Sequence, residues 1–149
     1  MRPMSQAETA KAVQLLDLML EFFVDDDRWT RGCYDNGNGG RCLVGALLNI
    51  GRQHRLPTTP AMALLQDAMP QPGLPLVHFN DTRCGSLAEL RSVISKARRL
   101  ADDVAECEKA AAAARAWLFA RFKKEQIDTV VDIDEAAPGK PLATERLAA

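Results

Sequence analysis

The sequence predicts a mainly α-helical fold: a single-domain bundle of about five helices, with a small irregular or β-hairpin element near residues 29–41 and a long C-terminal helix. Three observations support this prediction. Apolar residues recur at every third or fourth position in several segments, which is the spacing of one helix face. Two capping boxes mark helix starts, and segments rich in glycine and proline separate the apolar patterns. With 149 residues, of which 47% are apolar, the chain is long enough to bury a hydrophobic core.

The first predicted helix begins after Ser5, which forms a capping box with Glu8. We expect this helix to end near residues 25–27, because three consecutive aspartates there are unfavourable at the negative end of the helix dipole. Residues 29–41 contain several glycines and are expected to form short strand pieces around a turn at residues 35–37.

Two short helices are predicted next. One begins at or just before Cys42 and is closed by Gly51. The other begins at Thr59, a good N-cap that is followed by a proline, and it ends before Pro70. After a loop rich in proline, residues 76–79 are predicted to be a short extended segment.

A second capping box, Ser86 with Glu89, opens the longest apolar pattern in the chain. The pattern runs over residues 87–126 without glycine or proline, and as one helix it would be about 60 Å long. A small domain cannot cover that length, so we expect the segment either to break into two helices or to pair with another surface. The predicted interaction residues are Leu100, Val104, Ala111, Leu118 and Phe122.

The predicted organisation is one helical domain over residues 1–132. Its compact core covers residues 5–101, its helical extension covers residues 102–130, and residues 133–149 are expected to form a flexible tail because they are rich in proline, glycine and alanine.

Composition restricts the function classes. A formal net charge of −1 argues against a nucleic-acid partner, since such domains are usually basic. We find no signal segment and no apolar run long enough for a membrane span, so we expect a cytoplasmic protein with reduced cysteines and no membrane partner. The residues suggest no cofactor.

Cys42 raises the question of thiol chemistry. A cysteine in the first turn of a helix, next to an arginine such as Arg41, can have a lowered pKa, which is one requirement of a catalytic thiol. A catalytic thiol needs a base, for which His78 is the candidate, with Asn80 or Asp81 orienting the imidazole. The other interpretation is that Cys42 packs as a small apolar residue.

A structural zinc site is a weaker alternative. Cys33, Cys42, His78 and Cys84 would supply four suitable ligands. Neither the pair Cys33 and Cys42 nor the pair His78 and Cys84 has the usual spacing of two to four residues, so no metal ligands are assigned.

Residues 78–82 also have a structural interpretation, because Asn and Asp side chains satisfy backbone donors in turns. On this interpretation Asp81 accepts a hydrogen bond from the Trp29 indole or caps the helix that begins at Cys42. Gly45 would let that helix pack closely against a neighbouring segment.

Three motifs occur in order: Trp29, then residues 42–47 with the sequence CLVGAL, then Phe79-Asn80-Asp81. In these motifs the chain resembles a family of small uncharacterised domains from bacteria and their phages, over about residues 7–101. The resemblance implies a shared fold and no catalytic roles. It groups one structural constellation: Trp29, Cys42, Gly45, Asn80 and Asp81.

The leading functional hypothesis is a non-catalytic protein-interaction module that self-associates through the long C-terminal helix or binds a protein partner. One form would be a mobile-element or phage-related protein that binds a host protein. The alternative is a thiol hydrolase or transferase that uses Cys42 and His78.

Overall fold

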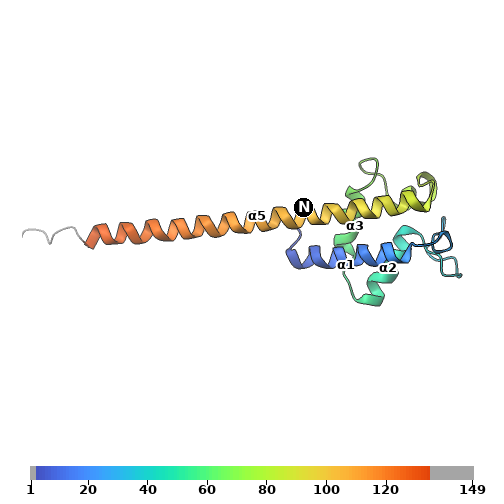
Figure 1. The fold of residues 1–149 in the computed structure, drawn as a ribbon, viewed down its shortest axis with the longest axis horizontal. Coiled ribbons are helices and arrows are strands. Elements are labelled where there is room, and N and C mark those ends of the chain that lie inside the picture. Colours follow the sequence, from blue (N-terminus) through green and yellow to red (C-terminus); the bar gives the residue numbers. More distant parts are fainter. Residues whose placement is uncertain (1–2, 135–149) are drawn as a thin grey trace, which may run out of the picture. The chain divides into compact units, whose positions relative to one another are not determined.

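The computed structural model describes residues 3–134, with side chains described up to residue 128. These residues form helices joined by loops and contain no β-sheet, so the prediction of a mainly α fold is confirmed (Figure 1). Contacts divide the chain into two compact units, the first ending at Lys109 and the second beginning at Ala110. The predicted flexible tail, residues 133–149, lies outside the described residues except for its first two positions.

Helix α1 (Gln6–Phe22) begins as predicted, with both hydrogen bonds of the Ser5–Glu8 capping box present. It ends at Phe22, earlier than the predicted end near residues 25–27. Phe23 leaves the helical conformation and its side chain is fully buried. Arg91 donates hydrogen bonds to the carbonyls of Leu20 and Phe23 at 2.6 and 2.5 Å, which satisfies the end of the helix. A 3₁₀ turn, η1 (Asp26–Arg28), follows.

Helix α2 (Leu43–His54) starts at the predicted place, with Cys42 as its N-cap. The predicted closure at Gly51 is wrong, because the helix continues to His54 and ends on Arg55 in a left-handed conformation. Gly51 serves packing instead: a Cβ there would lie 2.5 Å from the Cγ2 atom of Thr58. Helix α3 (Thr58–Asp67) has Pro57 as its N-cap, so the predicted N-cap at Thr59 is wrong, and the helix ends before Pro70, as expected.

The prediction of an extended segment at residues 76–79 is wrong. Residues Leu76–His78 form the short helix α4, which continues into the π-helical turn η2 (Phe79–Arg83). Leu76 and Phe79 are both buried, and their spacing of three places them on one face of a helix. The Thr82 hydroxyl donates to the carbonyl of His78 at 2.7 Å, and the Cys84 N–H donates to that of Phe79 at 2.8 Å.

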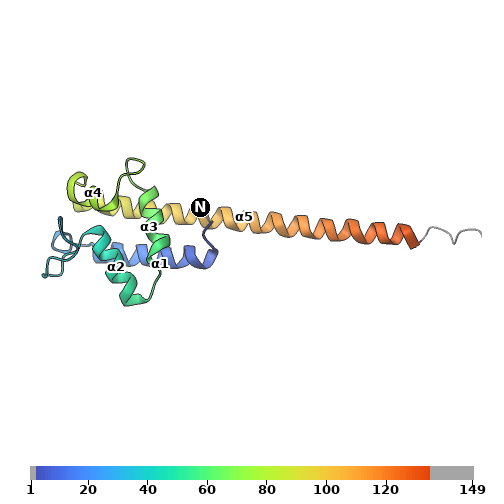
Figure 2. The ribbon, with the colours of Figure 1, turned by 180° about the vertical axis from the view of Figure 1, so that it is seen from behind.

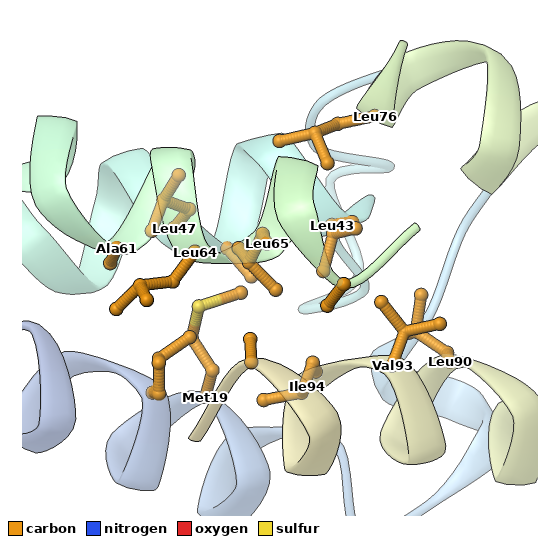
Figure 3. Packing of buried hydrophobic residues seen from close by; sticks show 14 of the residues in the cluster. Met19, Leu43, Leu47, Ala61, Leu64, Leu65, Leu76, Leu90, Val93 and Ile94 are labelled. Carbon is orange, nitrogen blue, oxygen red and sulfur yellow. The ribbon is translucent and has the colours of Figure 1, made fainter. Parts of the chain in front are cut away.

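Helix α5 (Leu87–Asp134) is one helix and not two. In the first unit it lies antiparallel beside α1, since Arg98 pairs with Asp17 at 3.0 Å while Arg91 reaches the end of α1 (Figure 2). Its buried residues there end at Ala101. The core is formed by apolar side chains of α1, α2, α3, α4, η2 and this part of α5. Figure 3 shows Met19 of α1 pointing toward Leu64 and Leu65 of α3, with Ile94 of α5 beside it.

Candidate functional site

Asn80 in η2 is the centre of a buried hydrogen-bond network. Its side chain has no solvent-exposed surface. The Oδ1 atom accepts hydrogen bonds from the Trp29 indole N–H at 2.9 Å and from the Leu43 backbone N–H at 3.0 Å. The Nδ2 group donates to the Thr30 carbonyl at 3.0 Å and to the Asp81 carboxylate at 2.7 Å. All four hydrogen-bonding positions of the amide are therefore used.

This network joins three parts of the first unit: the loop after η1, the start of α2, and η2. The prediction placed Asp81 in this role, but Asn80, one residue earlier, fills it. An amide suits the position better than a carboxylate, because it must accept from two N–H groups and also donate to the Thr30 carbonyl.

Asp81 holds the next part of the same loop. Its Oδ1 atom accepts a hydrogen bond from the Gly32 backbone N–H at 3.0 Å in addition to the bond from Asn80. These two hydrogen bonds, with that of Gly32 contributing most, lower the pKa of the Asp81 carboxyl from its ordinary value. Nearby, the Arg31 guanidinium stacks 4.6 Å from the Trp29 ring centroid and donates to the Cys84 carbonyl.

Cys42 and Gly45 fix the start of α2 against the loop. The Cys42 sulfur accepts a hydrogen bond from the Gly45 N–H at 3.2 Å, and the Cys42 N–H donates to the Tyr34 carbonyl at 3.4 Å. A Cβ atom on Gly45 would lie 2.1 Å from that carbonyl oxygen. The helix therefore contacts the loop backbone directly. This agrees with the expectation that Gly45 lets the helix pack closely against a neighbouring segment.

Cys42 lacks the lowered pKa that the thiol interpretation requires, and its side chain is buried, as in the interpretation of a small apolar residue. Burial is the largest effect on this thiol and raises its pKa, outweighing the hydrogen bond from Gly45 that stabilises the thiolate. Arg41 does not support a thiolate either, because it pairs with Asp35 at 2.9 Å.

The other members of the predicted thiol arrangement are also engaged elsewhere or exposed. His78 is exposed, and within residues 3–128 no hydrogen bond joins its side chain to Cys42. Asn80 has no free donor or acceptor with which to orient an imidazole. These contacts favour the structural interpretation of the Cys42, Asn80 and Asp81 side chains.

The four residues of the zinc alternative are not assembled into a site. Among the described residues, no group of three or more His, Cys, Asp or Glu side chains is placed to hold a metal ion. All four cysteines are free; Cys42 and Cys84 are buried, whereas Cys33 and Cys107 are exposed. The Cys84 thiol donates to the Ser86 carbonyl at 3.2 Å.

A second candidate site lies on α5 in the second unit, where every side chain described, over residues 110–128, is exposed. Five large apolar residues there have exposed fractions between 50% and 74%. We call them the exposed apolar segment: Trp117, Leu118, Phe119, Phe122 and Ile127. The Arg121 guanidinium lies 5.4 Å from the Trp117 ring centroid and pairs with Glu125 at 3.2 Å.

The predicted interaction residues divide between the two units. Leu100 packs partly against the core of the first unit, and Val104 is half-buried. Ala111, Leu118 and Phe122 are exposed. The prediction missed Trp117, Phe119 and Ile127 because it followed one helix face, whereas three consecutive large apolar residues at 117–119 lie on several faces.

Comparison with known proteins identifies a family. Residues 7–114 match the model of a family described as a family of unknown function, DUF6197. The chain belongs to DUF6197. The predicted membership of an uncharacterised small-domain family is therefore confirmed, and the DUF6197 match extends beyond the expected limit at residue 101. No curated protein and no solved structure matches the chain.

The DUF6197 match includes the complete Asn80 network and ends before Trp117. The exposed apolar segment therefore lies outside the region shared with the family model. No helix in the described part of the chain has both the length and the apolar character required to cross a membrane.

Proposed function

We propose that this protein is a non-catalytic interaction module of the cytoplasm that self-associates through the exposed apolar segment of α5. The observation that carries the proposal is the exposure of five large apolar side chains within eleven helical positions, Trp117 to Ile127. Single exposed apolar residues are common on protein surfaces, but a contiguous group is typical of an interaction site.

The energetic reason is the apolar area that association would remove from water. Complete burial of a leucine or phenylalanine side chain contributes about 1.5–3 kcal/mol. Even partial burial of Leu118 and Phe122 on both copies would offset a large share of the cost of association, about 4–15 kcal/mol. The five consecutive alanines at 110–114 leave room for a second helix to approach closely.

The non-catalytic part of the proposal is supported by the Asn80 network. Its polar groups are satisfied within the protein, and the Cys42 thiol is buried with a raised pKa. In this proposal the network serves to hold the loop at residues 29–41 against α2.

The test is the molar mass of the full chain in solution, measured by sedimentation equilibrium. We expect the wild-type chain to be an oligomer and Leu118→Gln/Phe122→Gln to be a monomer, with the dissociation constant raised at least about tenfold. Leu48→Gln is the matched control, since Leu48 is an exposed leucine on α2 in the first unit. A monomeric wild-type chain at high micromolar concentration would disprove self-association.

A host protein is the other occupant of this segment that the phage-related resemblance suggests. A monomeric wild-type chain that binds a purified host protein, with the Leu118→Gln/Phe122→Gln variant unable to bind it, would establish that function in place of self-association.

A further inference from the structure

Charge changes sign along α5 within the second unit. Residues 110–124 contain four basic side chains and no acidic one, a net charge of +4; they are Arg115, Arg121, Lys123 and Lys124. Residues 125–134 contain four acidic residues and no basic one, a net charge of −4; they are Glu125, Asp128, Asp132 and Asp134. We call these ranges the basic block and the acidic block. Both lie on one continuous helix.

We propose that the partner of the exposed apolar segment is a second copy of this chain, paired antiparallel through residues 110–134. This inference rests on the proposed function and specifies its geometry. A parallel pair in register would place the basic blocks side by side and the acidic blocks side by side. An antiparallel pair places each basic block beside an acidic block, and flanking charges of this kind set the orientation of paired helices.

The antiparallel register also brings the apolar residues together. The midpoint of the basic block is residue 117 and that of the acidic block lies between residues 129 and 130. When these midpoints are aligned, residue 117 of one copy lies opposite residues 129–130 of the other. The exposed apolar segment of one copy, residues 117–127, then lies beside the same segment of its partner along most of its length. One arrangement thus satisfies the charge pattern and also overlaps the two apolar segments along the helix axis.

An anionic lipid surface is a different kind of occupant. A basic helix with Trp, Phe and Leu side chains, such as residues 110–124, is typical of segments that lie on membranes. The acidic block follows without interruption, however, so residues 110–134 have no net charge. Charge complementarity therefore favours the second copy.

The experiment measures energy transfer between fluorophores on two copies of the full chain. Exposed Cys33 and Cys107 are changed to serine, and single cysteines are introduced as Ala112→Cys or Val130→Cys, five helical turns apart. In the antiparallel pair, positions 112 and 130 of different copies are offset by only about 7 Å along the helices, whereas two copies of position 112 are offset by about 34 Å. In a parallel pair the order reverses, with offsets of about 27 Å and zero.

Stronger transfer for the 112/130 mixture than for the 112/112 mixture is the result expected. Stronger transfer for 112/112 in a chain that is dimeric by sedimentation would overturn the antiparallel inference and leave self-association intact. No transfer in either mixture, with a monomeric mass, would overturn both. A monomeric chain that sediments with phosphatidylglycerol vesicles, but not with phosphatidylcholine vesicles, would also overturn both and assign the segment to anionic lipid.

Discussion

Asn80 illustrates how one side chain can organise an irregular part of a fold. Its amide, which has no exposed surface, bonds to Trp29, which is 51 positions earlier in the sequence, and to Leu43, which is 37 positions earlier. In the unfolded chain, water forms hydrogen bonds with the Trp29 indole N–H and the Leu43 backbone N–H. In the native state the Asn80 amide must take the place of that water.

The first prediction concerns removal of that amide. Asn80→Leu retains the approximate size of the side chain but leaves the Leu43 N–H, the Trp29 indole N–H and the Thr30 carbonyl without their partner. We expect the free energy of unfolding to fall by about 2–4 kcal/mol in urea denaturation. Thr82→Ala in the same turn removes an exposed hydrogen bond and should cost less than about 1 kcal/mol. Equal effects of the two changes would contradict a central role for Asn80.

The second prediction concerns pH and Asp81. Because the pKa of this carboxyl is lowered in the folded state, its stabilising contribution is present above its ordinary pKa near 3.9 and is lost as pH falls through the lower folded value. Asp81→Asn should therefore be less stable than the wild type at pH 7, by under about 1 kcal/mol because the group is partly exposed. This difference should shrink below about pH 4. Unfolding in urea at pH 7 and pH 3 measures it, with uncharged Thr82→Ala as control; a difference independent of pH would rule out the ionised carboxylate as its cause.

Helix α2 depends on a glycine for its position, which leads to the third prediction. In Gly45→Ala the new methyl group meets the Tyr34 carbonyl, a backbone atom that can move only if the loop moves. We expect a loss of about 1–3 kcal/mol in the free energy of unfolding. Gly85→Ala is the matched control, since its nearest neighbour is the flexible Glu89 side chain at 3.2 Å. If thermal unfolding shows both variants at the wild-type midpoint, the close contact at Gly45 does not determine the position of α2.

Local signals explain which helices the sequence could predict. The Ser5–Glu8 capping box acts within four residues, and the start of α1 agrees with it. The same holds for the start of α5, where the Glu89 N–H donates to the Ser86 hydroxyl at 3.2 Å. By contrast, the short helix α4 depends on tertiary packing, since Leu76 and Phe79 are buried and the turn η2 that follows is stabilised by contacts of Asn80 with residues far away in the sequence. Residues 76–79 considered alone therefore suggested an extended segment.

The sequence identified residues of the candidate site, but it did not predict which hydrogen bonds they form. The motifs identified Trp29, Asn80 and Asp81 together, but the choice between Asn80 and Asp81 as the central residue depends on the number of donors and acceptors around it. Likewise, apolar spacing identified Leu118 and Phe122 as interaction residues, but it could not show that they are exposed while Leu100 is not. Only the packing shows that Leu100 lies partly against the core of the first unit.

The chain combines a region that matches the DUF6197 model, residues 7–114, with a helical segment beyond residue 114 that the family model does not include. The first unit buries most of its apolar side chains around one core, whereas the apolar side chains described in the second unit, over residues 110–128, are exposed. Under the proposed antiparallel pairing, recognition should depend on the charge blocks in this segment.

The fourth prediction tests that dependence. Lys123→Glu/Lys124→Glu reduces the charge of the basic block from +4 to zero, so the attraction to the acidic block of the second copy is lost. We expect the dissociation constant from sedimentation equilibrium to rise at least about tenfold at low salt, and the difference from wild type to shrink toward about 0.5 M salt, where charges are screened over a few ångströms. Lys11→Glu reverses an exposed lysine on α1 and should leave the constant unchanged. Tighter association of the double variant at low salt would mean that the basic blocks repel each other in the wild-type pair, as they would in a parallel dimer.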